Sequence, residues 1–554
     1  MLRTHNCGEL RKSDIGKEVM LCGWVQSTRD HGGIIFVDLR DRYGITQLVF
    51  NPEHNKILYE EAKKLSRECV IKATGHVIAR KKGMENKALA TGEVEVLVDA
   101  LEVLNYSEMP PFEISERAKI SEEIRLKYRY LDLRRANLQR NLILRHKVAL
   151  AAREYFDSKD FIEIETPILS IHTPEGAREF LVPSRLHLGK FYSLPQSPQL
   201  YKQICMVAGL DRYFQIARCL RDEDLRADRQ PEFTQIDVEM SFVTREDVLE
   251  TIEGLIKHIF KKVLNIELKP FKKLTWREAL SRFGSDKPDL RFGFELVDVS
   301  SIAAAHFKSE SVFVLNLGKT KIKTLPPGVK AGKVKDKTIV GLEFLPKAAQ
   351  AQIVDKIKAS TNDYLIFSSG KFPECAQKLG ELRKEIGKKL KLQGWQFVWI
   401  IDCPMFELVQ GAVQPSHHIF TSPLREDLHL LESEPLKVRA NQYDLVLNGW
   451  EIGSGSIRIN KKELQERVLN IIGHSYEEIE KKFGFLLNAF KYGAPPHGGI
   501  ALGLDRLVAL MCGTNDIREV IAFPKNKAAQ GVMEGSPSAA SENELKLLGL
   551  SIVK

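Results

Sequence analysis

The order of strands in the N-terminal part of the chain restricts its fold more than any other feature of the sequence. Five strand-like runs lie there, with a helical stretch, residues 52–65, between the third and the fourth. The runs are residues 18–26, 33–38, 45–50, 69–78 and 93–103. Five strands with a helix after the third is the order of an OB-fold barrel, whose exposed face and loops bind single-stranded nucleic acid. Residues 1–104 are therefore expected to form such a barrel.

Two barrel side chains are candidates for contacts with bases. Phe36 lies on a strand that also carries Arg40, and Gln47 lies on the next strand. Phe36 could equally belong to the barrel core, and a small barrel of this kind could exist without a ligand. The chain has 82 Lys and Arg and 73 Asp and Glu, which gives a net charge of +9. This charge permits a nucleic-acid partner but does not prove one.

The composition is that of a globular chain. Of its 554 residues, 43% are hydrophobic and 28% are charged, and this length suggests three or four domains. The apolar runs are far shorter than the roughly 20 residues of a membrane span, and the N-terminus lacks the core of a signal peptide. The eight cysteines form no CxxC pair, which excludes a disulfide framework and a thiolate zinc site. We expect a cytoplasmic protein without a membrane segment.

Changes in composition divide the rest of the chain. Met109-Pro110-Pro111-Phe112 marks a linker, which continues into a basic stretch ending at Arg135; most of its arginines are expected on a solvated helix face. Residues 291–392 differ in composition from their surroundings and indicate a separate α+β insertion. The expected segments are the barrel 1–104, a linker 105–135, the two parts 136–290 and 393–532 of one domain, the insertion 291–392, and a tail 533–554.

The segment from Glu232 to Met240 carries charges where a sheet should carry apolar residues. With a period of two, Ile236, Val238 and Met240 lie on one face and Phe233, Gln235, Asp237 and Glu239 on the other. The preceding loop, from Arg218 to Arg229, is dense in guanidiniums and carboxylates. Arginine binds phosphate oxygens in a bidentate way, so this loop indicates a site for a phosphate-bearing substrate.

A second hairpin turns at Asn448-Gly449, a strong two-residue turn signal. This turn pairs Leu447 with Trp450 and Val446 with Glu451, and it places Asp444 on the same face as Glu451, on the diagonal. Two carboxylates together with phosphate oxygens are the usual ligands of Mg²⁺. Arg458 has the opposite parity to Glu451, so it would point away from the site unless a bulge at Gly453 or Gly455 turned it back.

Three motifs, in order, give the chain a family resemblance. They are Phe161-Ile-Glu163-Ile-Glu-Thr166-Pro167 (motif 1), Arg221-Asp222-Glu223 with Phe233 (motif 2), and Gly499-Ile-Ala-Leu-Gly503-Leu504-Asp505-Arg506 (motif 3). Together with Thr173-Pro-Glu175-Gly-Ala-Arg178 and Gln196-Ser197-Pro198-Gln199-Leu-Tyr-Lys202, they resemble the class II aminoacyl-tRNA synthetases, and specifically the bacterial-type aspartyl-tRNA synthetases. The resemblance runs essentially from end to end. It implies an α+β multidomain fold: an OB-fold anticodon-binding barrel, an antiparallel catalytic sheet with flanking helices, and an inserted GAD-like domain.

The resemblance implies an ATP site built from motifs 2 and 3. Arg221 would bridge the α-phosphate and the substrate carboxylate, Phe233 would stack on adenine, and Arg506 would bind the γ-phosphate. The implied ATP-binding residues are Arg221, Asp222, Glu223, Gln230, Phe233, Glu451, Gly503, Leu504, Asp505 and Arg506. Arg221, Glu451 and Arg506 are the implied catalytic residues, and Asp444 with Glu451 would hold Mg²⁺, in agreement with the hairpin argument.

The resemblance also implies an aspartate site. Lys202, Arg458 and His417 would face the β-carboxylate, although the adjacent His418 could be the ligand instead. The implied aspartate-binding residues are Glu175, Ser197, Gln199, Leu200, Tyr201, Lys202, Arg221, Asp237, His417 and Arg458. A cationic pocket of this kind rejects asparagine, because a neutral amide leaves buried charges unpaired.

The implied reaction is ATP-dependent ligation of L-aspartate to tRNA through an aspartyl-adenylate. His31 in the loop after the first strand and Gly83 in a later turn resemble the residues of non-discriminating enzymes, which charge both tRNA(Asp) and tRNA(Asn) and depend on a separate amidotransferase. Motif 1 implies a homodimer. Four alternatives remain: a strictly tRNA(Asp)-specific enzyme, an asparaginyl- or lysyl-type synthetase, a small-molecule amidoligase, and a catalytically dead RNA-binding paralogue.

Overall fold

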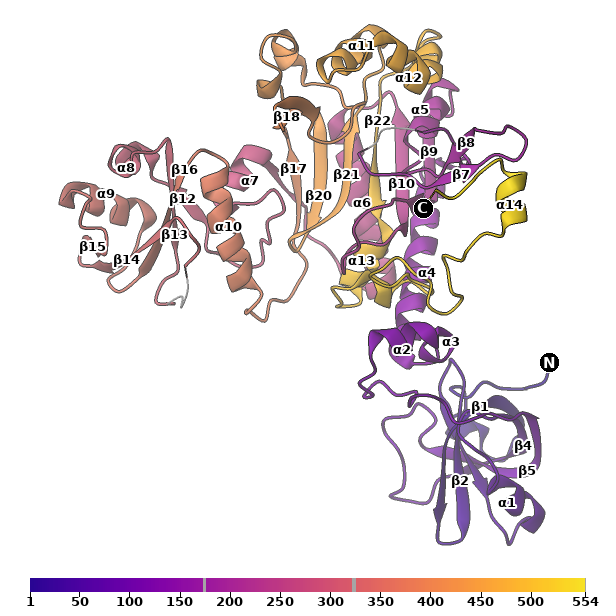
Figure 1. Cartoon of the computed structure of the whole chain (residues 1–554). Helices are drawn as coiled ribbons and strands as arrows, with labels where there is room; N and C mark the ends of the chain where they lie inside the picture. The colour runs from indigo at the N-terminus through magenta and orange to yellow at the C-terminus, as the bar shows by residue number, and fades with distance from the viewer. Residues whose placement is uncertain (173–175, 321–324, 554) are drawn as a thin grey trace. The chain divides into compact units, whose positions relative to one another are not determined.

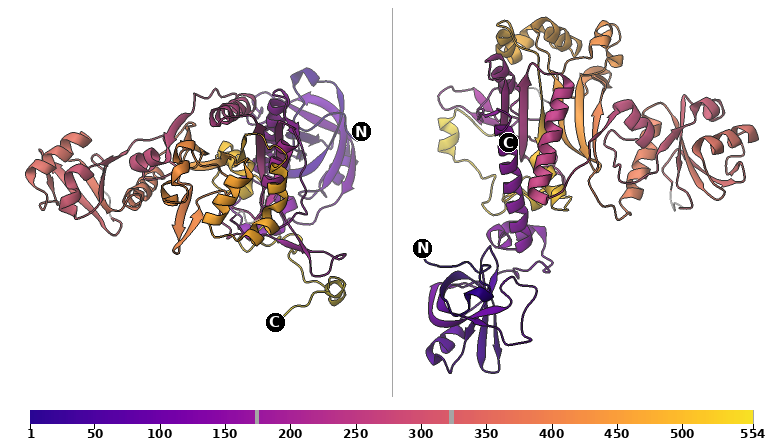
Figure 2. Two further views of the ribbon diagram at one scale, coloured as in Figure 1. Left: turned by 90° about the horizontal axis from the view of Figure 1, so that it is seen from above. Right: turned by 180° about the vertical axis from the view of Figure 1, so that it is seen from behind.

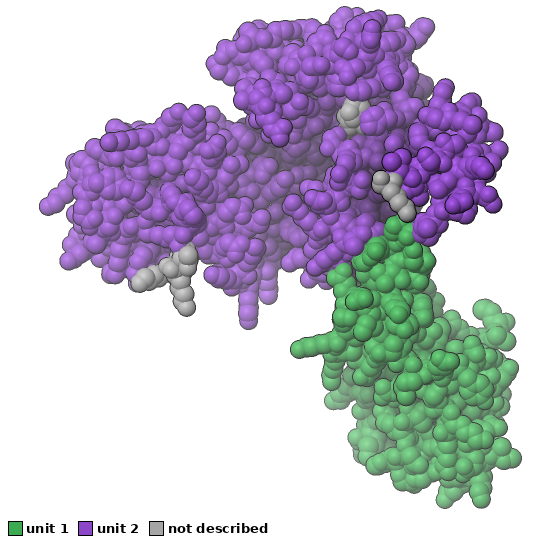
Figure 3. Space-filling view, in the orientation of Figure 1, with its two compact units in different colours: residues 1–143, 522–526, 530–537 green, residues 144–521, 527–529, 538–554 purple. Residues whose placement is uncertain are grey.

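The computed structural model describes residues 1–172, 176–320 and 325–553 (Figure 1). The chain divides into two compact units (Figure 3). Unit 1 comprises residues 1–143, 522–526 and 530–537, and unit 2 comprises residues 144–521, 527–529 and 538–554. The six segments expected from the sequence are finer than these two units. In the described part of the chain, no helix is long and apolar enough to cross a membrane.

Unit 1 contains a closed five-stranded barrel, which confirms the expected OB-fold. Its strands are β1 (Glu18–His31), β2 (Ile34–Arg40), β3 (Ile45–Phe50), β4 (Val70–Ala79) and β5 (Val94–Asn105), and they close in the order β1-β2-β3-β5-β4. Helix α1 (Lys56–Ala62) follows β3, and its N-cap Asn55 accepts hydrogen bonds from the N–H groups of Ile57 and Leu58. The strands alternate, so Ile35, Val37 and Leu39 of β2 are buried in the barrel core.

The basic stretch after the barrel forms α2 (Glu122–Lys127) and α3 (Arg129–Asp132). Asp132 is fully buried there and forms ion pairs with Arg125 at 3.0 Å, Arg129 at 2.6 Å and Arg135 at 3.2 Å. Burial of a carboxylate requires such compensation. The expectation of a solvated helix face is therefore wrong for Arg129 and Arg135, which are both buried.

Unit 2 is built on an eight-stranded sheet with the order β11-β17-β20-β21-β22-β10-β9-β6. The strands are β11 (Lys272–Thr275), β17 (Phe397–Ile401), β20 (Gln442–Leu447), β21 (Trp450–Ile457), β22 (His497–Gly503), β10 (Glu232–Ser241), β9 (Arg212–Leu220) and β6 (Ile162–Glu163). Neighbouring strands are antiparallel except for the two edge pairs, β11 with β17 and β6 with β9. The expected antiparallel sheet is confirmed.

Helices cover one face of this sheet. The long helices α4 (Ala136–Asp157) and α6 (Arg245–Leu264) lie across it in the view from behind (Figure 2). Ile236 and Val238 of β10 pack there against Phe156 of α4 and Ile252 of α6 in a fully buried cluster. Burial of each such side chain contributes roughly 1.5–3 kcal/mol. Because successive side chains of a strand alternate, Gln235, Asp237 and Glu239 of β10 point to the opposite face.

The insertion forms its own layered structure. Its five-stranded sheet has the order β12-β13-β16-β14-β15 and consists of β12 (Leu296–Asp298), β13 (Ser311–Asn316), β16 (Tyr364–Gly370), β14 (Val329–Lys335) and β15 (Thr338–Val340). Helices α8 (Ser300–Phe307) and α9 (Lys347–Ile357) contribute to one hydrophobic cluster on this sheet, and α10 (Glu374–Gly387) contributes to another. The chain enters the insertion after α7 (Trp276–Phe283).

The remaining α-helices and strands lie outside these three sheets. They are α5 (Gln199–Val207), α11 (Lys462–Ile471), α12 (Tyr476–Phe490), α13 (Leu504–Met511), α14 (Glu542–Leu547) and the hairpins β7 (Leu181–Pro183) with β8 (Phe191–Ser193) and β18 (Phe406–Val409) with β19 (Ala412–Pro415). Helices α5 and α13 matter most for the site, because the first turn of each contributes to a pocket on the sheet.

Candidate active site

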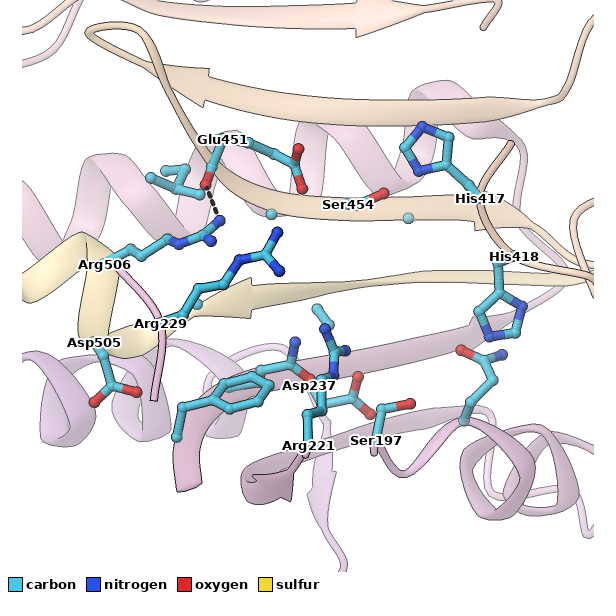
Figure 4. A pocket seen from close by; sticks show the side chains of 18 of the residues that line it. Ser197, Arg221, Arg229, Asp237, His417, His418, Glu451, Ser454, Asp505 and Arg506 are labelled. Carbon is cyan, nitrogen blue, oxygen red and sulfur yellow. Dashed lines mark hydrogen bonds between the residues drawn. The ribbon is translucent and has the colours of Figure 1, made fainter. Parts of the chain in front are cut away.

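The face of the large sheet opposite α4 and α6 carries a pocket of about 380 Å³. Strands β10, β21 and β22 form its floor, and side chains from the starts of α5 and α13 and from the loop after β9 form its walls. Arg506 and Arg229 lie near Glu451 at one end, and Asp237, Ser197 and His418 lie toward the other (Figure 4). We call the end with Arg506, Arg229 and Glu451 the cationic end. We call the end with Asp237, Ser197 and His418 the mixed end, because side chains of different charge lie there.

Four buried charged groups form the mixed end. Lys202 Nζ donates to Asp237 Oδ1 at 2.7 Å and lies 3.3 Å from Glu239 Oε2. Arg458 donates to Glu239 from Nε at 2.9 Å and from Nη2 at 3.1 Å, and its Nη1 donates to Ser456 Oγ at 2.8 Å. Two cations and two anions balance one another, which makes the burial of all four possible.

The two carboxylates of this cluster differ in their electrostatics. Burial raises the pKa of Asp237, and Lys202 offsets only part of this effect. Burial also acts on Glu239, but Arg458 and Lys202 outweigh it, so the pKa of Glu239 is lowered. Oδ2 of Asp237 is buried and has no hydrogen-bond partner among the described residues. Asp237 lines the pocket, and this oxygen is an acceptor suited to a ligand ammonium group.

A bulge in the second hairpin brings Arg458 to the pocket. Leu447 pairs with Trp450 and Val446 with Glu451, as expected from the turn, but Leu445 pairs with Gly453. Ile452 is therefore an extra residue on β21, and it reverses the parity of everything that follows. A Cβ on Gly453 would lie 2.4 Å from the buried side chain of Leu502, so a larger residue there would displace that side chain.

Two adjacent histidines occupy different environments. His417 is partly exposed, and its Nε2 lies 4.0 Å from Asp444 Oδ2. His418 accepts the N–H of Phe420 on Nδ1 at 3.2 Å, which leaves the proton of the neutral ring on Nε2. That Nε2 is buried without a hydrogen-bond partner in the described residues. Burial, with the charges of Arg458 and Lys202, lowers the pKa of His418 well below its ordinary value, so the ring is a neutral donor.

The cationic end contains the motif 2 and motif 3 side chains. The guanidinium of Arg221 lies over the ring of Phe233, 5.0 Å from its centroid, and Arg229 pairs with Glu223 at 2.8 Å. Arg506 donates from Nη1 to the carbonyl oxygen of Glu451 at 3.1 Å. Gln230, Gly503 and Asp505 also line this part of the pocket. Guanidiniums beside an aromatic face suit a nucleotide, with phosphates on the former and a base on the latter.

Asp444 and Glu451 are carboxylates from the two strands of the same hairpin. Burial raises the pKa of Asp444, His417 lowers it, and the nearby charge of Glu451 raises it again, for a net upward shift. The described residues contain no group of three or more His, Cys, Asp or Glu that could hold a metal ion alone. These two carboxylates therefore fit Mg²⁺ only as part of a ligand set that a nucleotide would complete.

Some residues expected at the site lie elsewhere. Leu200 and Leu504 pack into hydrophobic clusters, and the Tyr201 hydroxyl lies 3.3 Å from Ser170 Oγ. Asp222 donates its N–H to the carbonyl oxygen of Arg178 at 2.9 Å. Glu175 lies outside the described residues.

Asp505 of α13 connects three parts of unit 2 through its carboxylate. Its Oδ2 accepts the N–H of Thr234 at 2.7 Å, and its Oδ1 pairs with Arg145. The expected residues that do line the pocket are Ser197, Gln199, Lys202, Arg221, Glu223, Gln230, Phe233, Asp237, His417, Glu451, Arg458, Gly503, Asp505 and Arg506.

Sequence reasoning missed several residues of the pocket wall. Lys287, from the segment between α7 and the insertion, lies 3.0 Å from Glu451. Its setting, Ser285-Asp286-Lys287-Pro288-Asp289, has the composition of a linker. Gln442 also lines the pocket, and its place two residues before Asp444 on the same strand was the available signal. Ser454 lines the pocket as well, but only because the bulge at Ile452 reverses its parity.

The residues expected to contact tRNA lie on the barrel. Phe36 alternates with the buried residues of β2 and so lies on the outer face. Gln47 is buried and donates to Glu95 at 2.7 Å. His31 is exposed at the end of β1, before Gly32 and Gly33 at φ +63° and +79°. Gly83 has φ +85°, and its N–H donates to the carboxylate of Glu85 at 2.9 Å.

Comparison with known proteins decides the family. A profile described as an OB-fold nucleic acid binding domain matches residues 19–104. A second, described as tRNA synthetases class II (D, K and N), matches residues 121–527 and so more than half of the chain. The chain belongs to the class II tRNA synthetases (D, K and N). The family expected from the three motifs is confirmed.

Similar proteins extend over the whole length of this synthetase. The Aspartate--tRNA(Asp/Asn) ligase of Caldanaerobacter subterraneus subsp. tengcongensis is 49% identical over 99% of the chain and 98% of its own length. The Aspartate--tRNA(Asp/Asn) ligase of Thermoanaerobacter sp. is 47% identical with the same coverage. The Aspartate--tRNA ligase of Ruminiclostridium cellulolyticum is 47% identical over 100% of the chain and 98% of its own length. The synthetase is therefore a member of the aspartate--tRNA ligases.

Solved structures support the fold. An asparaginyl-tRNA synthetase from Pyrococcus horikoshii, complexed with asparaginyl-adenylate, matches with a TM-score of 0.64 and 20% identity over 95% of this chain and 98% of that one. A putative aspartyl-tRNA synthetase from Leishmania major Friedlin matches with a TM-score of 0.63 and 19% identity over 95% and 94%. At this identity the likeness concerns the fold alone.

Proposed function

We propose that this synthetase ligates L-aspartate to both tRNA(Asp) and tRNA(Asn) through an aspartyl-adenylate, with ATP and Mg²⁺. The observation that carries the substrate assignment is the buried cluster of Lys202, Asp237, Glu239 and Arg458 on the pocket floor. It offers an acceptor for an ammonium group and cationic donors for a carboxylate. Relatives named for ligation of aspartate to tRNA support the same assignment.

Aspartate would bind at the mixed end of the pocket. Its ammonium group would donate to the free Oδ2 of Asp237, and its β-carboxylate would accept from Arg458, which keeps further N–H groups beyond those bound to Glu239 and Ser456. We place the Nε2–H of His418 beside that carboxylate as a neutral donor, in preference to His417, because His418 Nε2 is buried and unpaired. Asparagine would leave Arg458 and Lys202 facing an amide, at a large energetic cost.

ATP would bind at the cationic end. The adenine would stack on Phe233, and Arg221 would lie between the α-phosphate and the α-carboxylate of aspartate, since it is next to both ends. That position suits attack of the carboxylate on the α-phosphorus, with Arg506 and Arg229 holding the outer phosphates. Mg²⁺ at Asp444 and Glu451 would neutralise phosphate charge.

We further propose a homodimer in the cytoplasm. Strand β6 of motif 1 lies at the edge of the large sheet, and apolar side chains gather in and after it. Ile162, Ile168, Leu169 and Ile171 are 44–52% exposed. Several exposed apolar side chains beside an open sheet edge suit a two-fold interface. The barrel would contact the anticodon through Phe36 on its outer face and through Gln47, which would have to exchange its bond to Glu95 for one to a base.

One assay tests the substrate and the reaction together. ATP–pyrophosphate exchange by the full-length protein is expected to depend on aspartate and to show no stimulation by asparagine or lysine. Stimulation by asparagine or lysine would assign a different synthetase of the same family. Absence of exchange with all three would point to the RNA-binding alternative.

A further inference from the structure

Among the described residues, Lys287 is the one wall residue of the pocket that comes from the entrance to the inserted domain. Its Nζ lies 3.0 Å from Glu451 Oε2 and 3.9 Å from Asp286 Oδ2. A lysine ammonium is charged at neutral pH, so this contact places a positive charge at the pocket wall.

The segment that carries Lys287 is fixed by the inserted domain. Arg383 of α10 is buried and donates to the carbonyl oxygens of Asp289 at 2.8 Å and Phe292 at 3.0 Å. Gly284, which ends α7, packs against Gly380 of α10 so closely that a Cβ on Gly380 would lie 2.0 Å from the carbonyl oxygen of Gly284. Both ends of the short segment are thus held, and the Lys287 ammonium has a defined position.

Lys287 and Arg506 approach the same residue from two directions. Arg506 donates to the main-chain oxygen of Glu451 at 3.1 Å, and Lys287 pairs with its side-chain carboxylate. Together with Arg229, they bring three cationic side chains to this end of the pocket, each beside a carboxylate that a phosphate oxygen could replace. A half-exposed ion pair contributes little to stability, and the side chain of Lys287 is 44% exposed, so folding alone gives little reason for a lysine here.

We propose that Lys287 is a triphosphate-binding residue, which contacts the outer phosphates of ATP and the pyrophosphate that leaves. The inserted domain then acts as the support that holds this lysine at the pocket. A lysine suits this task because its compact ammonium can exchange a carboxylate oxygen for a phosphate oxygen. This inference rests on the proposed placement of ATP in the pocket.

The test compares nucleotides that do and do not carry the outer phosphates. Lys287→Met keeps the length of the apolar stem and removes the charge. Titration calorimetry on the full-length variant is expected to show affinities for ATP and for inorganic pyrophosphate lowered by roughly tenfold to a hundredfold. Affinities for AMP and for aspartate should stay within about twofold of the wild type. Lys287→Arg should restore most of the binding of ATP.

Arg282→Met is the matched control. Arg282 lies on α7, pairs with Glu295 at 2.9 Å and is 46% exposed, so removal of its charge should leave all four affinities unchanged. Equal losses for AMP and ATP in Lys287→Met, or no loss for either, would overturn the inference. If the wild type binds neither ATP nor AMP, the proposed ATP site itself fails, and that outcome is distinguishable because it does not depend on the variant.

Discussion

Glu239 holds the guanidinium of Arg458 through two hydrogen bonds, at 2.9 and 3.1 Å, on the floor of the pocket. Both side chains are buried. The orientation of the arginine is thus set by a carboxylate on the neighbouring part of the sheet before any ligand binds. Preorganisation of this kind lowers the cost of ordering the arginine when a substrate carboxylate arrives.

Loss of the Glu239 charge should weaken aspartate binding selectively. Glu239→Gln removes the negative charge that pairs with Arg458 and Lys202, so their positions are no longer fixed. We expect the KM for aspartate to rise by about tenfold or more, in line with loss of a charge-assisted hydrogen bond, while the KM for ATP stays within about twofold. Steady-state ATP–pyrophosphate exchange measures both values.

Glu232→Gln serves as the control for this change. Glu232 lies on the same strand, and its pair with Arg218 is largely exposed, so its neutralisation should alter neither KM. Equal increases in both KM values for Glu239→Gln would indicate general damage to the site and contradict the selective role.

Removal of the Glu451 charge should stop adenylate formation without unfolding the protein. Glu451→Gln keeps the size of the side chain, but a neutral amide neutralises no charge on Mg²⁺. We expect most of the exchange activity to be lost, above all at limiting Mg²⁺, with an unchanged circular dichroism spectrum. Glu432→Gln, at an exposed pair with Arg467, is the control. Near-normal exchange at limiting Mg²⁺ would show that the carboxylate assignment is wrong.

Much of the fold and part of the site follow from local patterns. The alternation in β10 separates Ile236 and Val238 from Asp237 and Glu239, and the turn at Asn448-Gly449 fixes the pairing of Val446 with Glu451. Both depend on a period of two or on a two-residue turn, which act over short distances along the chain. The five barrel strands lie within a few residues of their expected bounds for the same reason.

The rest of the site depends on tertiary contacts. The sequence allowed a bulge at Gly453 or Gly455, but the extra residue is Ile452, directly before Gly453, which pairs with Leu445 of β20 and with Leu502 of β22. Adjacent histidines look alike in the sequence, and only the structure shows that His418 Nδ1 accepts the N–H of Phe420. Lys287 lies beside Glu451 because Arg383 of α10, in the insertion, holds the segment that carries it. No pattern in the nearby sequence predicts this long-range contact.

The lowered pKa of His418 predicts how stability depends on pH. Its folded-state pKa lies well below the ordinary value, so below about pH 6.5 the unfolded chain binds a proton that the folded chain does not. Stability is therefore lost on acidification, by up to about 1.4 kcal/mol per pH unit from this residue. Urea midpoints between pH 7 and pH 5 should fall more steeply for the wild type than for His418→Asn.

An exposed histidine provides the comparison. His429 lies outside the pocket on the surface of unit 2, and His429→Asn should keep the wild-type slope. Parallel curves for His418→Asn and the wild type would contradict the buried, neutral state of His418.

The exposed apolar segment predicts a dimer. Light scattering is expected to give twice the chain mass of 62.9 kDa. Ile162→Glu places a charge at the edge strand β6, where desolvation in an interface would be costly, and should shift the mass toward the monomer. Ile57→Glu is the control, because Ile57 is also exposed but lies on α1 of the barrel. A concentration-independent mass of about 63 kDa for the wild type would rule out the dimer.

The two barrel turns predict which tRNAs are charged. His31 is exposed directly before two glycines at positive φ, and a Cβ on Gly83 would meet no atom within 4 Å. The glycines also serve the turn geometry itself, so the test must change the histidine. The tRNA(Asp) and tRNA(Asn) anticodons differ at their last base, and small turns with open space exclude the last base of tRNA(Asn) less strictly than bulky turns do.

The wild type is expected to aspartylate both purified tRNAs, which leaves aspartyl-tRNA(Asn) for a separate amidotransferase. His31→Leu should shift the ratio of kcat/KM values toward tRNA(Asp), whereas His76→Leu on β4, where the histidine bonds to Asp99, should leave it unchanged. Charging of tRNA(Asp) without detectable aspartylation of tRNA(Asn) would overturn the relaxed specificity and establish the strictly tRNA(Asp)-specific alternative. The synthetase assignment would stand, since the proposed adenylate site lies in unit 2 and does not depend on these turns.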